Sequence, residues 1–145
     1  MEEALKEAVL SLPEDVPVGA VVVKDGKIIG RGRNVREKDH SPSGHAEVRA
    51  IEAAAKSTGD WRLSGCDLYV TLEPCPMCAG LIRSARIRCV YFGAYDPEYG
   101  AAGSVYNLLD PFVKIRPYVL GTESGALLGR FFSEMREKSE KRGAL

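Results

Sequence analysis

The sequence predicts an α/β protein with three layers, α/β/α, around a mixed sheet of about five strands that starts with an antiparallel hairpin. Three observations support this fold class. Two apolar runs flank an Asp-Gly pair near the N-terminus, which is typical of a hairpin. Later, a helical segment joins two strand-like runs, as in a parallel crossover unit. Helical segments also lie before, between and after the strands, so both faces of the sheet can be covered.

The N-terminal half is expected to hold a helix, the hairpin and a second helix. Leu12-Pro13 ends the first helix, and Asp25-Gly26 favours the tight turn of the hairpin. In the second helix Val48, Ile51 and Ala55 fall on one face, as in a helix that packs on a sheet. The expected bounds are a helix over residues 2–11, strands over 17–24 and 27–33, a polar loop over 34–44 and a helix over 45–57.

The C-terminal half is expected to continue the sheet with parallel strands. Pro117 places the last strand at an edge, because proline lacks the N–H that a central strand needs. The loop after the second of these strands is rich in Gly and Asp and follows a strand end, where α/β proteins usually bind ligands. The expected elements are strands over 67–72, 87–93 and 114–121, helices over 76–86, over 105–109 and from about 122, and a loop over 94–104. In the last helix we expect an apolar face of Leu128, Phe131 or Phe132, and Met135, followed by a polar tail that frays.

Size and charge limit the possible functions. The chain has 145 residues, which suggests a single domain over 1–145 that can fold without a metal or disulfide. Its 20 basic and 20 acidic residues give no net charge, so a nucleic acid would have to be attracted by local patches. No apolar run approaches the roughly 20 residues that span a bilayer, and the acidic N-terminus is unlike a secretion signal. We therefore expect a cytoplasmic protein with no membrane partner.

Four cysteines are present, and thiols stay reduced in the cytosol. Metal binding, redox chemistry or burial therefore come before disulfides as explanations. Cys66 and Cys89 lie at apolar strands and are expected to be buried structural thiols. Cys75 and Cys78 form a Cys-x-x-Cys pair within TLEPCPMCAG, which by itself fits a redox dithiol, part of a structural zinc site or part of a catalytic one.

His45 opens one predicted helix, and Cys75 and Cys78 straddle the start of another. Helix N-termini favour negative charge, which lowers a cysteine's pKa and yields the thiolate that binds metal. Two thiolates and one neutral imidazole make a suitable three-ligand zinc set that leaves a fourth position open to water. Glu47 does not share a helix face with His45, so it is better interpreted as a neighbour of the site that can accept a proton from zinc-bound water.

Three other interpretations of these residues remain open. His40 and His45 have the spacing of half a Cys2His2 site, so His40 could close the fourth position of a structural zinc knot. A strand, Cys-Pro-Met-Cys and a helix are also the setting of thioredoxin-like redox motifs, although this leaves Glu47 unexplained. Simple burial of all these groups would leave Glu47 as a core carboxylate without a partner, which is costly.

The pattern of His45-Ala46-Glu47 followed by Pro74-Cys75-Pro76-Met77-Cys78 resembles the H-x-E…P-C-x-x-C signature of zinc-dependent nucleotide and nucleobase deaminases. The resemblance implies the cytidine deaminase-like fold. Within that superfamily the chain is most similar to the bacterial tRNA-specific adenosine deaminases. The similar segments span Val16 to Arg136 and are VPVGAVVV, GRN, HAEVRAIEAA, LYVTLEPCPMCAG, SARI, GAYDPEYGAAGS and FFSEMR.

The resemblance also implies a role for each residue that matches the family's pattern. One Zn²⁺ per chain, with a bound water or hydroxide, would be held by His45, Cys75 and Cys78, and Glu47 would carry protons. Asn34 would hydrogen-bond the base in a pocket lined by Ala46. Asp96 would contact the flanking nucleotide, and Arg136 would meet a phosphate of the anticodon stem. A homodimer is the assembly that the resemblance implies.

The expected activity is therefore conversion of adenosine to inosine at the wobble position of a tRNA anticodon loop. The target nucleotide must be unstacked, and a loop is an easier substrate for this than a duplex. Two departures favour an alternative, deamination of a free nucleobase or nucleoside such as cytosine or guanine. Glu98 stands where many relatives carry lysine, and DPFVKIRPYV lacks the Asn-His-Arg triplet usual before the last strand. A riboflavin-pathway deaminase is disfavoured, because that group has a longer cysteine spacing. A zinc-stabilised RNA-binding module would have no use for Glu47.

Overall fold

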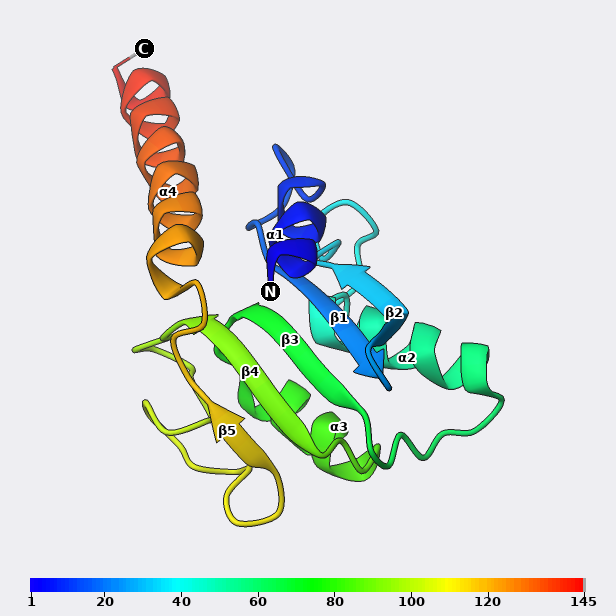
Figure 1. Ribbon diagram of the computed structural model, residues 1–145. Helices are drawn as coiled ribbons and strands as arrows, with labels where there is room; N and C mark the ends of the chain where they lie inside the picture. Colours follow the sequence, from blue (N-terminus) through cyan, green and yellow to red (C-terminus); the bar gives the residue numbers. More distant parts are fainter. Residues whose placement is uncertain (145) are drawn as a thin grey trace.

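A computed structural model describes residues 1–144 and contains a five-stranded sheet in the order β2-β1-β3-β4-β5 (Figure 1). Four helices accompany the sheet within these residues. The elements are α1 (Glu2–Val9), β1 (Gly19–Lys24), β2 (Lys27–Arg33), α2 (Ala46–Thr58), β3 (Asp67–Leu72), α3 (Pro76–Ser84), β4 (Cys89–Ala94), β5 (Lys114–Arg116) and α4 (Gly121–Gly143).

The strand directions confirm the predicted mixed sheet. β1 runs antiparallel to both β2 and β3, whereas β4 is parallel to β3 and β5 is parallel to β4. The hairpin at Asp25-Gly26 and the β3-α3-β4 crossover are both present as expected. Because β3 and β4 are parallel neighbours, their C-terminal ends lie at the same edge of the sheet, together with the start of α3.

The helices form two layers, one on each face of the sheet (Figure 1). α2 and α3 cover one face, and the main hydrophobic core lies beneath them. α1 packs on β1 and α4 packs on β4 on the opposite face. Glycine allows the close approach of α2 to β2, because a Cβ at Gly30 or Gly32 would overlap the helix backbone. The predicted α/β/α class is therefore confirmed.

The buried face of α2 differs from the predicted one. Val48 and Ala55 are only half-buried, whereas Ile51 is in the core. Small side chains face β2 because its glycines let the two backbones approach so closely that a large residue would not fit between them. The buried residues of α2 are Ala46, Glu47, Ala50, Ile51 and Ala54.

The segment between β4 and β5 also departs from the sequence prediction. Residues 105–109 form no helix, because the N–H groups of Val105 and Tyr106 both donate to the Gly100 carbonyl, at 2.9 and 3.0 Å, and hold a tight loop. β5 is only three residues long rather than the predicted span over 114–121, since Pro117 ends the pairing. Its predicted place at the sheet edge is confirmed.

The N-terminal part of α4 packs on β4 and β3, and the rest of the helix extends away from the sheet (Figure 1). Its buried side includes Leu127 and Phe131, while Leu128 is half-buried and Phe132 and Met135 are 46% and 48% exposed. The buried leucine of α4 is thus Leu127, one residue before the predicted Leu128. The polar tail stays helical to Gly143 instead of fraying, because Glu, Lys and Arg are strong helix formers.

Cys66 and Cys89 are buried free thiols, as the sequence predicted. Burial raises the pKa of both thiols above the ordinary value. Neither thiol belongs to the cluster that His45 forms with the other two cysteines. Across residues 1–144, no helix combines the length and the apolar character needed to cross a membrane.

Candidate metal and catalytic site

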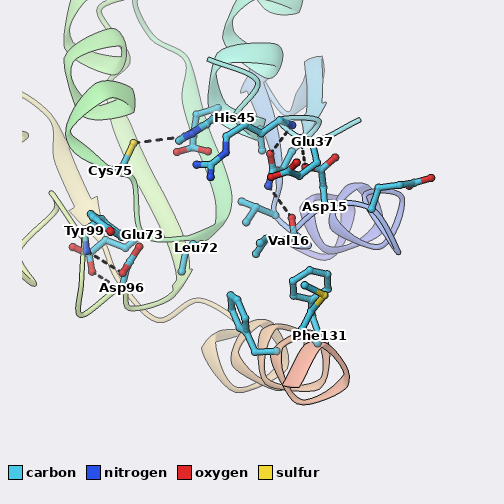
Figure 2. Close-up of a pocket in the computed structure, with 18 residues that line it drawn as sticks. Asp15, Val16, Glu37, His45, Leu72, Glu73, Cys75, Asp96, Tyr99 and Phe131 are labelled. Atoms are coloured by element: carbon cyan, nitrogen blue, oxygen red, sulfur yellow. Dashed lines mark hydrogen bonds between the residues drawn. The ribbon is translucent and has the colours of Figure 1, made fainter. Parts of the chain in front are cut away.

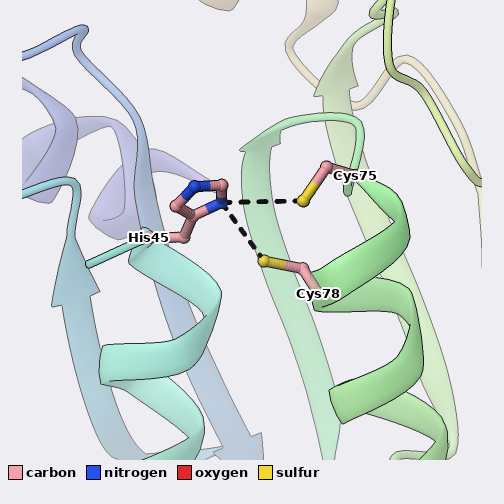
Figure 3. A group of neighbouring side chains, drawn as sticks. All are labelled: His45, Cys75 and Cys78. Carbon is pink, nitrogen blue, oxygen red and sulfur yellow. Dashed lines mark hydrogen bonds between the residues drawn. The ribbon is translucent and has the colours of Figure 1, made fainter. Parts of the chain in front are cut away.

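The starts of two helices meet beside the C-terminal end of β3. His45 is the N-cap residue of α2, and Cys75 is the N-cap residue of α3, with Pro76 in the first helical turn. Proline suits that position because its missing N–H has no partner there in any helix. Both residues have extended backbone, so their side chains precede the helices and point toward one another (Figure 3).

The three side-chain donors have the spacing of ligands around one zinc ion. His45 Nδ1 lies 3.6 Å from Cys75 Sγ and 3.5 Å from Cys78 Sγ, and all three ligand atoms lie within 4.8 Å of one another. A tetrahedral zinc with bonds of about 2.3 Å to sulfur and about 2.0 Å to nitrogen would place such atoms roughly 3.6 Å apart. The donor set, two sulfurs and one imidazole nitrogen, is also one that zinc prefers. These residues therefore fit a zinc ion with one open position.

The electrostatics of the metal-free cluster favour a thiolate at Cys75. Hydrogen bonding from Cys78, followed by His45, lowers the pKa of Cys75 to about 4. The hydrogen bond with Cys75 raises the pKa of Cys78. A separate contact between Cys75 and His45 raises the pKa of His45, because it stabilises the imidazolium. The cluster therefore holds protons that a metal ion must displace, and zinc binding is expected to release them.

Glu47 lies in the first turn of α2, where the sequence placed it, and is only 4% exposed. Burial raises the pKa of this carboxyl, and contact with the Cys78 thiol offsets part of the effect. The residue lines the same cavity as His45 and Cys75. A buried carboxyl with a raised pKa beside a metal position is suited to accept and return a proton near neutral pH.

His40 does not join this cluster. It is exposed, on a loop, and outside the group formed by His45, Cys75 and Cys78. The arrangement therefore favours a three-ligand site with an open position over a structural zinc knot. The contact of both cysteines with one imidazole nitrogen likewise favours a metal site over a redox dithiol, which needs no such third group.

A cavity of about 730 Å³ opens beside the cluster and is large enough for a nucleobase (Figure 2). Its walls come from elements that are distant in the sequence, including the loop before β1, the loop after β2, the end of β3 and the face of α4. Phe131, Phe132 and Met135 supply the α4 wall, which explains why two of these apolar residues remain exposed there.

Asn34 and Ala46 both line this cavity. The Asn34 amide donates to the Val16 carbonyl at 3.1 Å, and its oxygen accepts from the Arg36 N–H at 3.1 Å. These bonds fix the side chain in place while one amide hydrogen and one lone pair remain for a ligand. Ala46 is buried and contributes a small apolar surface.

The structure brings Asp96 to the cavity but not Arg136. Asp96 lines the wall, and its carboxylate accepts from the N–H groups of Glu98 and Tyr99 at 3.0 and 3.1 Å, so it also shapes its own turn. Arg136 is exposed on α4, beyond the cavity wall, where it donates to Ser133 at 3.2 Å. Glu98 is exposed and is not part of the cavity lining, so its charge lies outside the pocket itself.

Glu73 is a structural part of this site that the sequence did not reveal. It is 2% exposed, and its carboxylate accepts from the N–H groups of Asp96, Ala102 and Ser104 at 3.2, 3.0 and 3.1 Å, and from the Ser104 hydroxyl. A Cβ at Gly100 would strike this carboxylate, which explains the glycine. Glu73, two residues before Cys75, therefore holds in place the loop that carries Asp96 (Figure 2).

Replacing Glu73 with glutamine is expected to lower kcat/KM by roughly 10- to 100-fold while the zinc content stays unchanged. The amide nitrogen cannot accept hydrogen bonds, so buried N–H groups of the loop lose their partner at about 1–3 kcal/mol each. Steady-state kinetics and metal analysis of the purified protein would measure both. Glu52→Gln, an exposed change on α2, is the matched control. Wild-type kinetics in Glu73→Gln would mean that the loop holds its position without this carboxylate.

Asp15 has a similar role on the opposite wall. It is 1% exposed and accepts from the N–H groups of Glu37 and Lys38 at 2.7 and 3.1 Å. These bonds hold the loop after β2, which carries Asn34. In the sequence Asp15 stands beside Glu14 in a short polar stretch, so nothing distinguishes the buried carboxylate from the exposed one.

Acidic residues outnumber basic ones in the lining of this cavity. Among the described residues that line the cavity, Arg36 is the one lysine or arginine. Three of its carboxylates, those of Asp15, Glu47 and Glu73, are buried. The six acidic residues that line it are Glu14, Asp15, Glu37, Glu47, Glu73 and Asp96. The attraction of a polyanionic substrate must therefore come from other surfaces of the molecule.

The α/β/α fold, the His-Cys-Cys cluster and the buried glutamate beside it together define a zinc-dependent deaminase. Comparison with known families agrees. The family model for the cytidine and deoxycytidylate deaminase zinc-binding region matches residues 1–94, which include the whole cluster. The chain belongs to this family of zinc-binding deaminases.

Individual relatives are similar over nearly the full chain. A tRNA-specific adenosine deaminase of Bacillus subtilis is 44% identical over 97% of this chain and 91% of its own length. A solved structure from work on A-to-I editing by tRNA:A34 deaminases at the wobble position has 41% identity and a TM-score of 0.82, and it covers 88% of this chain and 96% of its own. A guanine deaminase structure from Bacillus subtilis is 39% identical, with a TM-score of 0.63 over 72% of this chain and 67% of its own.

Proposed function

We propose that this deaminase converts adenosine to inosine at the wobble position of a tRNA anticodon loop. The observation that carries the proposal is the 44% identity to a tRNA-specific adenosine deaminase across 97% of the chain. The open metal position and the base-sized cavity beside it support the same activity. An anticodon loop also presents its bases unpaired, so one of them can enter the cavity at a lower cost than a base of a duplex.

In this mechanism His45, Cys75 and Cys78 hold the zinc through the atoms that face one another in Figure 3. Bound zinc supplies a Lewis acid that makes water a nucleophile at neutral pH. Glu47 would accept a proton from the attacking water and deliver it to the N1 ring nitrogen, and C6 of the base would gain the water oxygen. Glu47 then moves the second proton to the amino group, which leaves as ammonia, so adenosine plus water gives inosine plus ammonia.

Asn34 and Ala46 are positioned to orient the base in this proposal. The free amide hydrogen and lone pair of Asn34 can bond the edge of a purine, while Ala46 leaves room for the ring. Asp96 lies on the neighbouring wall, where a flanking nucleotide would pass. Arg136, exposed on α4, would contact a stem phosphate further out.

The wider setting follows from the same proposal. The enzyme would act in the cytoplasm, where its substrate and reduced thiols are found. We propose a homodimer as its assembly and a single catalytic domain over residues 1–145. The apolar residues that remain exposed on this single chain, Met77 among them, are compatible with a partner surface.

The expected result of a substrate comparison is ammonia release from an anticodon stem-loop that has adenosine at the wobble position. The zinc-loaded protein would be assayed against this RNA and against free adenosine, guanine and cytosine, with nucleoside analysis by mass spectrometry to detect inosine. The RNA should exceed the free compounds in kcat/KM by orders of magnitude, because contacts outside the base contribute to transition-state binding.

The same stem-loop with guanosine at the wobble position is the matched control, since it keeps every phosphate contact and lacks the target amino group at C6. Preference for free guanine or free cytosine over the RNA would overturn the proposed substrate and establish nucleobase deamination instead. Glu47→Gln supplies the background rate for every substrate.

A further inference from the structure

A second groove, of about 850 Å³, lies at the other end of α3 from the zinc cluster. Ten residues line it, and four of these are cations whereas none is acidic. Because the whole chain carries equal numbers of acidic and basic residues, this distribution is a strong local excess of positive charge. The lining residues are Gly80, Arg83, Ser84, Arg86, Ile87, Arg88, Pro111, Phe112, Val113 and Lys114.

Most of this positive charge is not neutralised by the protein itself. Arg88 pairs with Asp67 through two hydrogen bonds of 3.0 and 2.7 Å. Arg83, Arg86 and Lys114 are exposed, and no carboxylate in residues 1–144 lies within 4 Å of them. Three free cations around one groove create a favourable site for an anion.

Aromatic rings are interleaved with these cations. The guanidinium of Arg83 lies 4.1 Å from the ring centre of Phe112, which is 69% exposed. At the margin of the groove, Trp61 is 53% exposed and lies under Arg62 at 4.3 Å and Arg86 at 5.8 Å. Exposed aromatic rings beside arginines are typical of grooves that bind single-stranded nucleic acid, where bases stack and cations follow the backbone.

A purely structural explanation covers only part of this arrangement. Cations near the C-terminus of α3 interact favourably with the helix dipole, and Arg86 donates to the Arg83 carbonyl at 3.2 Å. Lys114 lies on another element, and the dipole gives no reason for exposing Phe112 or Trp61. Phe112 and Lys114 belong to DPFVKIRPYV, which lies between β4 and α4 and includes β5.

The two cavities are complementary in charge. The catalytic cavity is lined by six acidic residues and one arginine, and the groove by four cations and no acidic residue. α3 joins them, and its nine residues span about 13 Å. We propose that this groove is a second RNA-binding site, which holds the phosphates and stacks a base of the substrate strand while the target base lies in the catalytic cavity. The inference rests on the proposed function in its choice of RNA.

The test uses the full-length, zinc-loaded protein and a fluorescein-labelled anticodon stem-loop, with binding followed by anisotropy at several salt concentrations. The triple variant Arg83→Glu, Arg86→Glu and Lys114→Glu is expected to bind at least about tenfold more weakly. The slope of log K against log salt should also fall in magnitude by about two to three, because each lost phosphate contact removes roughly 0.7–0.9.

The matched control is Lys24→Glu, Lys27→Glu and Lys56→Glu, which reverses the same number of exposed charges outside the groove lining, at the hairpin turn and the end of α2. It should keep most of the affinity and the wild-type salt slope. Phe112→Ala is a second variant that preserves every charge. It should weaken binding about tenfold with the slope unchanged, because it removes a stacking surface only.

Each outcome tests the RNA-binding role of the groove separately from the proposed catalytic function. Free adenosine is too small to reach the groove, so its deamination, the zinc content and thermal unfolding should match the wild type in all variants. If no RNA is deaminated but the groove variants still lose binding and salt slope, the RNA site stands and the catalytic proposal fails. An unchanged affinity and slope in the triple variant overturns the site. A changed molecular mass in light scattering, with unchanged RNA binding, identifies the groove as a protein interface instead.

Discussion

Replacing Glu47 with glutamine is expected to reduce deamination by roughly 10²- to 10⁴-fold while zinc stays bound. Glu47 is buried beside the metal cluster but is not one of its three clustered donors. Glutamine has nearly the same shape, so it fills the same space, but it cannot accept a proton from water or return one to the base. We therefore expect the deamination rate of this variant to fall while its zinc content stays unchanged.

The measurement pairs ammonia release under saturating RNA with zinc analysis of the same preparation. kcat should fall with little change in KM, because the proton transfers occur only after the substrate is bound. Thermal stability at neutral pH should be unchanged or higher, because burial raises the pKa of this carboxyl, so the ionised form is costly in the fold.

Glu52→Gln is the matched control, since Glu52 lies on the same helix and is exposed. It should retain wild-type kcat, zinc content and stability. A Glu47→Gln protein with wild-type kcat would show that another group carries the protons, and a loss of zinc would show that Glu47 belongs to the ligand set.

The metal cluster could be predicted from the sequence because its chemistry depends on few local features. His45, Cys75 and Cys78 each stand at a helix start that proline or a polar loop marks, and the donor types themselves indicate zinc. Glu47 follows from its spacing to His45. The hairpin and the crossover were equally local, since an Asp-Gly turn and one helix between two strands specify them.

The loops that complete the site could not be predicted in the same way. Glu73 and Asp15 are acidic residues in short polar stretches, where an exposed position is the usual expectation, and only the tertiary structure buries them against backbone N–H groups. The buried face of α2 was displaced for a related reason, because glycines on β2 determine how closely the helix approaches. Long-range packing, rather than local propensity, decides these features.

The basic groove could not be predicted from the sequence either, because distant segments form it. Its lining combines residues 80–88 with residues 111–114, and Trp61 comes from a third segment. In the sequence each arginine is one of many exposed charges in a chain of zero net charge. The local excess of positive charge arises because the fold brings the end of α3 and the start of β5 together.

Replacing Cys75 with serine is expected to lower bound zinc from about one per chain to a small fraction and to abolish deamination. The serine hydroxyl does not ionise at neutral pH, whereas hydrogen bonds from Cys78 and His45 hold the pKa of the Cys75 thiol at about 4. A three-ligand site that loses a thiolate keeps one thiol and one imidazole, which bind zinc far more weakly. The fold should persist, because a 145-residue chain has a core of its own.

Zinc content after dialysis, chelator competition and circular dichroism would measure the three effects. Cys66→Ser is the matched control, because Cys66 is a free thiol outside the cluster and should leave zinc and activity unchanged. Full zinc retention in folded Cys75→Ser would remove Cys75 from the ligand set and reopen the redox interpretation of the Cys-x-x-Cys pair.

Removal of zinc from the wild-type protein tests the same assignment without any substitution. Chelation should free a thiolate at Cys75, which is half-exposed and has a pKa of about 4, so it should be alkylated by iodoacetamide at neutral pH. Cys66 and Cys89 should stay unmodified, because burial raises their pKa and shields them. Peptide mapping should therefore find label at Cys75 after chelation and none there when zinc is bound. Equal labelling in both states would mean that the thiolate does not bind the metal.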